Sequence, residues 1–270
     1  STVQNSRDHR KICVIDGKVA FTGGVNLADE YANEITRFGH WKDTAIMLKG
    51  DAVQSFTMLF LEMWAVNQME PADCQNYLTP KHVVPDPPHG YVIPYGDHPY
   101  DNENVGEEVY FHILNHSKKY VHIMTPYLIL DIEMIATLTR AAKSGIEVII
   151  IMPHIPDKWY AFVLAHTYYK ELIQAGVSIY EYTPGFVHAK VFVSDDDTAT
   201  VGTINLDYRS LYLHFECGAY IYDHPVVADI EQDFQETLKK CQKISLTEVE
   251  NRPVTYKVMG QILRLIAPLM

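Results

Sequence analysis

The chain has 270 residues, of which 47% are hydrophobic and 21% are charged, a balance typical of a folded globular protein. Its formal net charge of −12 argues against a general nucleic-acid-binding protein, which would normally show a basic excess. The length allows one large domain or two ordinary ones. No apolar run reaches the length of a membrane span, and Cys13, Cys74, Cys217 and Cys241 form no CxxC pair, so we expect free thiols in a reducing compartment.

The residues up to position 70 predict a β-hairpin, a third strand and a long helix. Asp16-Gly17 is a typical turn sequence between two apolar runs. The helix contains no Gly or Pro, and Asp51 precedes it as the expected N-cap. Its wide apolar face favours packing in the core over insertion into a lipid surface. The expected strands cover 11–15, 18–22 and 43–50, and the helix covers 51–68.

The rest of the chain predicts α/β layers after a proline-rich connection. Residues 71–99 hold seven of the fourteen prolines, which indicates a linker or an extended crossing. Beyond it, helices alternate with apolar strands, as in layered α/β proteins. Helices are expected near 105–118, 131–143, 158–175 and 225–241, and strands over 120–127, 146–152, 177–183, around His188, over 198–204 and over 217–223.

One motif occurs twice, with the copies 179 residues apart. A histidine and a lysine lie two positions apart and are expected to face the same side of a strand, followed by an aspartate at +7, a glycine at +14, a small residue at +15 and an asparagine at +17. Chance matches at these positions are rare, so we infer an internal duplication. The first copy is His9, Lys11, Asp16, Gly23, Gly24 and Asn26, and the second is His188, Lys190, Asp195, Gly202, Thr203 and Asn205.

Each copy also has its own carboxylate downstream. The sequence HWKD ends at Asp43 and precedes a strand and a helix, and the sequence HFEC does the same around Glu216. Roughly ninety residues of α/β sequence precede the second motif, whereas eight residues precede the first. We therefore expect the first copy to lack its N-terminal half and the chain to be a fragment.

These residue types suit the cleavage of a phosphodiester. Two lysines and two asparagines would surround the nonbridging oxygens, where charge builds in the transition state. One neutral imidazole would attack phosphorus, and the other, protonated, would donate to the leaving oxygen. A carboxylate on the far nitrogen of each ring would fix its tautomer, and Asp43 and Glu216 are the candidates. Lysine supplies the positive charge, so no metal is expected.

The duplicated pattern H-x-K-x4-D-x6-G-[GST]-x-N resembles the phospholipase D superfamily. The surrounding sequences AFTGGVNLADEY and GTINLDYRS, with the ending LRLIAPLM, are similar to the bacterial cardiolipin synthases over nearly the whole chain. The resemblance implies an α/β fold of duplicated phospholipase D-like lobes, with mixed sheets flanked by helices and the first lobe incomplete at its N-terminus. The expected parts are the C-terminal half of the first domain over 1–70, a linker over 71–88, a second domain over 89–245 and a C-terminal tail over 246–270.

The resemblance also implies a reaction, in which two phosphatidylglycerols give cardiolipin and glycerol through a phosphohistidine. His9 would be the nucleophile and His188 the acid, with the lysines and asparagines lining the pocket. Asp16 and Asp195 would be structural. The implied partners are phosphatidylglycerol, other anionic phospholipids and the surface of the bacterial cell membrane, with no nucleic acid and no cofactor.

Several alternatives stay open at this point. Water could attack the same intermediate, which would make the protein a phospholipase D-type hydrolase of lipid or, less expected, of nucleic acid. A truncated chain could also bind anionic lipid without turnover. Thr203 and Gly24 could simply be small enough to admit phosphate. Alternatively, the hydroxyl of Thr203 could form a hydrogen bond there. His112 and His116 share a helix face and are expected on the solvated surface.

Overall fold

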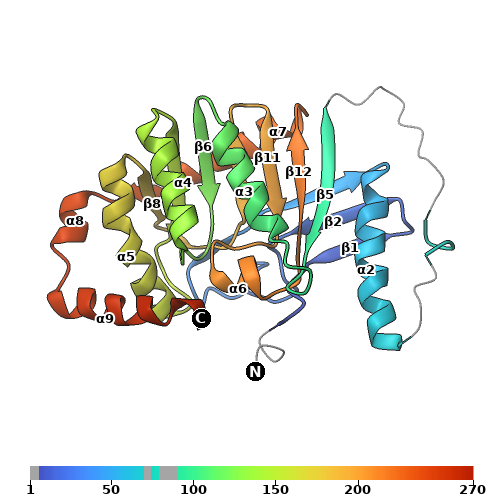
Figure 1. Ribbon diagram of the computed structural model, residues 1–270, viewed down its shortest axis with the longest axis horizontal. Coiled ribbons are helices and arrows are strands. Elements are labelled where there is room, and N and C mark those ends of the chain that lie inside the picture. Colours follow the sequence, from blue (N-terminus) through green and yellow to red (C-terminus); the bar gives the residue numbers. More distant parts are fainter. Residues whose placement is uncertain (1–5, 70–73, 79–89, 270) are drawn as a thin grey trace.

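The computed structural model describes residues 6–69, 74–78 and 90–269. Figure 1 shows a large sheet in the centre with helices on both faces, and a smaller sheet packed behind it next to helix α2. The small sheet, in the order β1-β2-β4, comes from the first copy of the motif, and the eight-stranded sheet comes from residues 91–243. The expected α/β fold with mixed sheets flanked by helices is confirmed.

The small sheet is the predicted hairpin plus one strand. Strands β1 (Ile12–Ile15) and β2 (Val19–Gly23) are antiparallel, and β4 (Ala45–Lys49) pairs with β2. Asp16 and Gly17 have φ of 52° and 63°, so the turn uses the left-handed region that Asp and Gly tolerate.

Helix α2 (Ala52–Gln68) follows the small sheet within the predicted bounds. It buries Val53, Phe56 and Leu61 but leaves Phe60 and Trp64 exposed. Asp51 occupies the N-cap position, but its backbone is helical and its side chain makes no capping hydrogen bond. The expectation that Asp51 caps the helix is therefore wrong, because an N-cap side chain reaches the backbone only from an extended conformation.

The large sheet mixes parallel and antiparallel pairs, in the order β13-β8-β7-β6-β10-β11-β12-β5. The pairs β6–β7 and β7–β8 are parallel and the others are antiparallel. The strands are β5 (Tyr91–Asp97), β6 (Tyr120–Met124), β7 (Glu147–Pro153), β8 (Ser178–Tyr182), β10 (Val191–Ser194), β11 (Thr198–Gly202), β12 (Glu216–Tyr222) and β13 (Cys241–Lys243).

Helices cover both faces of the large sheet. The helices α3 (Val105–His116), α4 (Ile132–Lys143) and α5 (Trp159–Ala175) lie in front of it in Figure 1, and α7 (Val226–Leu238) lies behind it. One core lies under the front helices, and a second lies between the large sheet, the small sheet, α2 and α7. Within the described residues, no helix is long and apolar enough to cross a bilayer.

The two motif histidines lie outside the strands on which the sequence placed them. His188 and Lys190 fall between β9 (Gly185–Val187) and β10, and His9 and Lys11 precede β1. The backbone leaves its own sheet at these points because each histidine amide bonds to the other half of the chain. His188 N donates to Lys42 O at 2.7 Å, and His9 N donates to Phe215 O at 3.0 Å.

These bonds belong to two equivalent crossings between the halves of the chain. Strand β3 (His40–Lys42) runs parallel to β9, with Trp41 opposite Phe186. At the other crossing, Asp8 forms an isolated bridge with Phe215. Each crossing brings the start of one motif next to the segment that ends in the carboxylate of the other copy.

The expected C-terminal tail is helical and packs on the body of the protein. Helices α8 (Leu246–Glu250) and α9 (Val254–Leu265) precede a 3-10 turn over Ala267–Leu269. Ser245 starts α8 with a full capping box, in which Glu248 bonds back to its backbone. The short helix α6 (Tyr208–Tyr212) was also not predicted. The expected linker over 71–88 lies largely outside the described residues.

We predict that Gly185→Ala weakens the β3–β9 crossing. A Cβ atom on Gly185 would lie 2.4 Å from His40 O and 2.5 Å from His40 N. These are backbone atoms, which can move away only if the two strands separate. Overpacking of this kind costs about 1–3 kcal/mol of unfolding free energy, measurable by urea unfolding. Ala45→Val, at an exposed strand position, is the control and should change stability by less than about 0.5 kcal/mol. Equal stability of the two variants would contradict the crossing's importance.

Candidate active site

Each motif histidine is hydrogen-bonded to the carboxylate of the other copy. His9 Nδ1 lies 2.8 Å from Glu216 Oε1 and 3.0 Å from Oε2. His188 Nδ1 lies 2.8 Å from Asp43 Oδ2. The sequence identified both carboxylates but gave each copy its own, whereas the structure exchanges them. The two crossings cause this exchange, because they align each histidine with the foreign strand that ends at the carboxylate.

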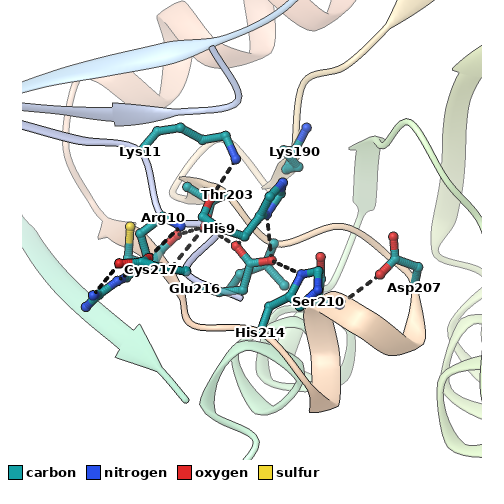
Figure 2. Close-up of polar contacts among 12 residues, drawn as sticks. His9, Arg10, Lys11, Lys190, Thr203, Asp207, Ser210, His214, Glu216 and Cys217 are labelled. Atoms are coloured by element: carbon teal, nitrogen blue, oxygen red, sulfur yellow. Dashed lines mark hydrogen bonds and ion pairs between the residues drawn. The ribbon is translucent and has the colours of Figure 1, made fainter. Parts of the chain in front are cut away.

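The two lysines place positive charge from both copies in the same site. Lys11 Nζ donates to the His9 carbonyl at 2.6 Å, and Lys190 Nζ donates to the His188 carbonyl. Lys190 is only 2% exposed, and its Nζ lies 3.0 Å from His188 Nε2. Figure 2 shows Lys11 and Lys190 in the upper part of the site, above the His9–Glu216 pair. The equivalent lysines of the duplication thus converge.

Burial and positive charge keep both imidazoles neutral at neutral pH. Burial, together with the charges of Lys11 and Lys190, lowers the pKa of His9 to about 3. Burial and the charge of Lys190 lower the pKa of His188 to about 4, although the bond to Asp43 opposes the shift. Burial also lowers the pKa of Lys190 to about 7. A bound anion would reverse all three shifts, because it would stabilise each charged form.

The two carboxylates differ in their electrostatics. Burial acts to raise the pKa of Asp43, but the hydrogen bond with His188 and the charge of Lys190 hold it below its usual value. Burial raises the pKa of Glu216, although the hydroxyl of Thr203 donates a hydrogen bond to it. Asp43 is therefore more strongly ionised than Glu216. The hydroxyl of Thr203 is thus bonded to Glu216.

The two asparagines of the motif have different surroundings. Asn26 Nδ2 donates to the hydroxyl of Tyr31 at 2.5 Å. Asn205 is 6% exposed, and its Oδ1 has no hydrogen-bond partner among the described residues. The ring of Tyr31 also meets the ring of His188 edge-on, with centroids 5.2 Å apart. Sequence reasoning missed Tyr31, which lies in the quoted run ADEY only five residues after Asn26.

The remaining motif positions have structural environments. Asp195 accepts hydrogen bonds from the backbone amides of Lys118, Lys119 and Tyr120 at 2.6–3.0 Å, and so ties two loops together. Asp16 forms the hairpin turn described above. A Cβ atom on Gly24 would lie 2.1 Å from Asp43 Oδ1, so the small residue admits the carboxylate.

The glycines at +14 allow close packing of strands. A Cβ atom on Gly202 would lie 2.5 Å from Cys217 O. Gly23 has φ of 150°, and its Cβ atom would lie 2.3 Å from Thr44 O. Gly202 therefore permits the close approach of the strand that carries Glu216, and Gly23 permits that of the segment next to Asp43.

His214 is a site residue that sequence reasoning did not single out. Its ring packs against the ring of His9 with centroids 5.6 Å apart, and its Nδ1 lies 3.8 Å from Glu216 Oε1. Neither ring nitrogen has a hydrogen-bond partner in the described parts of the chain. Burial, together with the repulsion between protonated His9 and His214 rings, lowers the pKa of His214 to about 4. The spacing signal was present, since His214 precedes Glu216 by two residues on the same segment.

His9, His214 and Glu216 are the residues with a geometry that could hold a metal ion. One ligand atom from each lies within 4.8 Å of the others, and no second group of this kind occurs among the described residues. Figure 2 shows the three side chains together below the lysines. Imidazole and carboxylate ligands suit zinc, but the charges of Lys11 and Lys190 nearby oppose a cation.

The sequence is similar to that of known proteins. Residues 110–238 match the family described as "Cardiolipin synthase, PLD-like domain". The chain is 55% identical over 271 residues to an uncharacterized protein of Streptococcus mutans, covering 100% of this chain and 58% of that protein. It is 37% identical over 266 residues to cardiolipin synthase 2 of Bacillus anthracis, covering 98% of this chain and 52% of the relative. The chain thus spans about half the length of the curated relatives that it matches.

The fold has a solved counterpart in phosphatidylserine synthase of Haemophilus influenzae. The TM-score is 0.75 at 15% identity, and the match covers 100% of this chain and 73% of the other. The duplicated motif and the fold define a protein of the phospholipase D superfamily. Within that superfamily, the sequence is similar to bacterial cardiolipin synthases over 98% of this chain and about half of the relative.

The lowered pKa values predict that acid destabilises the protein. The unfolded state has histidine pKa values near 6.5 and takes up protons first as the pH falls, whereas native His188 stays neutral down to about pH 4. The free energy of unfolding should therefore decrease from about pH 6.5 downward, with roughly 2 kcal/mol from His188 by about pH 4.5. Urea unfolding at several pH values measures this. His188→Asn should show a shallower decrease, and identical slopes would contradict the assignment.

Proposed function

We propose that the site transfers a phosphatidyl group from one phosphatidylglycerol to another and so forms cardiolipin and glycerol. The observation that carries this proposal is the pair of exchanged histidine–carboxylate contacts with Lys11 and Lys190 in the same site. One relative reported above is named cardiolipin synthase 2, and the matching family is described by the same activity, which supports the choice of reaction.

Binding places the phosphodiester between the two lysines. Its negative charge offsets the desolvation of Lys190 and raises the pKa of both histidines, so that one of them can hold a proton. The side chain of Asn205 is buried, and its amide nitrogen can donate to a phosphate oxygen. The site thus offers cations and amide donors to the charge that develops in the transition state.

The first step forms a phosphohistidine on His9. Nε2 of neutral His9 attacks phosphorus while the bond from phosphorus to the glycerol oxygen breaks. Protonated His188 donates its Nε2 proton to that oxygen, and glycerol leaves. Asp43 supports the imidazolium on His188 because its pKa is held low, whereas the raised pKa of Glu216 suits a neutral His9. This difference favours His9 as the nucleophile and His188 as the acid.

The second step transfers the phosphatidyl group to a second phosphatidylglycerol. Neutral His188 accepts the proton of the glycerol hydroxyl, whose oxygen attacks phosphorus as the bond to His9 breaks. Cardiolipin leaves, and both histidines return to their initial protonation states. Water in place of the hydroxyl would give phosphatidic acid, so the same residues serve a hydrolase, and the products distinguish the two reactions.

We predict that His9→Ala and His188→Ala each reduce turnover of phosphatidylglycerol vesicles by at least about a thousandfold. His9→Ala removes the group that bonds to phosphorus, and His188→Ala removes the group that transfers the proton. Thin-layer chromatography of the lipids measures cardiolipin and phosphatidic acid, and an enzymatic assay measures glycerol. Near-normal rates in either variant would contradict a shared site. Phosphatidic acid with glycerol, in place of cardiolipin, would overturn the transferase and favour the hydrolase.

The role of the His9–His214–Glu216 group can be tested with a chelator. Because lysine supplies the positive charge, we predict that turnover survives dialysis against EDTA. His214→Asn removes one possible metal ligand and serves as the matched variant, and EDTA and added Zn²⁺ should leave its turnover as unchanged as that of the wild type. Activity that EDTA abolishes and Zn²⁺ restores would contradict the metal-free mechanism.

A further inference from the structure

Helix α9 presents an apolar stripe that no described part of the chain covers. Val254, Val258, Ile262 and Ile266 recur every four residues and therefore lie on one side of the helix. They are all exposed, from 45% for Ile266 to 73% for Val254, and neighbouring Leu265 is 84% exposed. The opposite side buries Gly260 and Leu263 against α5. The helix is thus anchored on one side and apolar on the other.

The segment that carries this stripe is basic, unlike the whole protein. Residues 251–270 contain no Asp or Glu but include Arg252, Lys257 and Arg264, in a chain with a net charge of −12. A groove of about 190 Å³ between α5 and α9 is lined by Lys170, Arg252 and Lys257, and also by Glu250, which lies 3.0 Å from Lys170. Arg252 lies 4.0 Å from Glu181 and Arg264 lies 3.8 Å from Glu171. These long ion pairs flank the apolar stripe, and anionic headgroups would have to replace their carboxylates.

The stripe also lies beside the site. The 3-10 turn that follows α9 packs against α6, the helix that begins directly after Asp207 and precedes His214. Figure 1 shows α9 along the lower edge of the molecule, at the end where α6 lies and where α5 begins. Trp159 and Tyr160, in the first turn of α5, are 61% and 36% exposed at that end. Aromatic side chains of this kind prefer the boundary between water and lipid.

We propose that α9 docks the protein on an anionic phospholipid bilayer, an inference that rests on the proposed lipid chemistry of the site. The apolar stripe enters the boundary between headgroups and acyl chains, and the flanking cations bind the headgroups. Because the 3-10 turn after the helix packs against α6, docking places the site near the surface that supplies its substrate. Helix α2 also exposes Phe60 and Trp64, but it has no basic residue in its 17 positions.

The test compares binding to vesicles by flotation. The wild-type protein should bind vesicles of phosphatidylglycerol and phosphatidylcholine at least about tenfold more strongly than vesicles of phosphatidylcholine alone, and salt should weaken the binding. The triple variant Val258→Ser, Ile262→Ser, Leu265→Ser should lose at least about tenfold of that binding. Phe60→Ser with Trp64→Ser on α2 is the matched control and should bind as the wild type does. Lys257→Gln should reduce the salt dependence.

The outcomes separate docking from catalysis. Turnover of a short-chain, water-soluble phosphatidylglycerol should be unchanged in the triple variant, whereas turnover on vesicles should fall with binding. Wild-type binding by the triple variant would overturn the proposal, as would loss of binding only in the α2 control. A change of oligomeric state in the triple variant, without vesicle binding by the wild type, would assign the stripe to a second copy and also overturn it. Vesicle binding through α9 without any turnover would leave docking intact and refute the proposed reaction.

Discussion

The exchange of carboxylates between the two copies is the constraint on which the site depends. His9 is held by Glu216 and His188 by Asp43, across 207 and 145 positions of sequence. Neither copy therefore contains a complete histidine–carboxylate pair. The β3–β9 pair and the Asp8–Phe215 bridge exist at the two points where these contacts form. The strands that join the two halves therefore also align the imidazoles of the site.

The electrostatics of the site favour function over stability. Lys190 and Lys11 are taken out of water beside two neutral imidazoles, and burial lowers the pKa of both lysines. Such an arrangement costs stability until an anion binds, and this is the common trade-off at a preorganised site. The difference between a low pKa at Asp43 and a raised pKa at Glu216 breaks the symmetry of the duplication. Two near-identical motifs can then take the different roles of acid and nucleophile.

Local and repeated features could be predicted from the sequence, and long-range pairing could not. The spacing of the motif identified His9, Lys11, His188 and Lys190, and alternating apolar runs located most strands and the helices α2, α3, α4, α5 and α7. The exchange of Asp43 and Glu216 was not predictable, because it depends on strand pairings between distant segments. His214 aligns with His40, for which no role was proposed. Helix α9 was missed although Val254, Val258 and Ile262 recur every four residues. His188 left its expected strand because its amide bonds to Lys42 O instead.

The docking surface and the site share one end of the molecule, which connects the fold to the lipid chemistry proposed for it. The central claim is that both copies of the motif act on one phosphorus atom. A crystal structure with orthovanadate, which mimics the transition state, tests this most directly. The account predicts one vanadate within bonding distance of Nε2 of His9, with Nε2 of His188 on the opposite side and both Lys11 and Lys190 in contact with its oxygens. Vanadate bound by one copy alone, or by His9 and His214 through a metal ion, would contradict it.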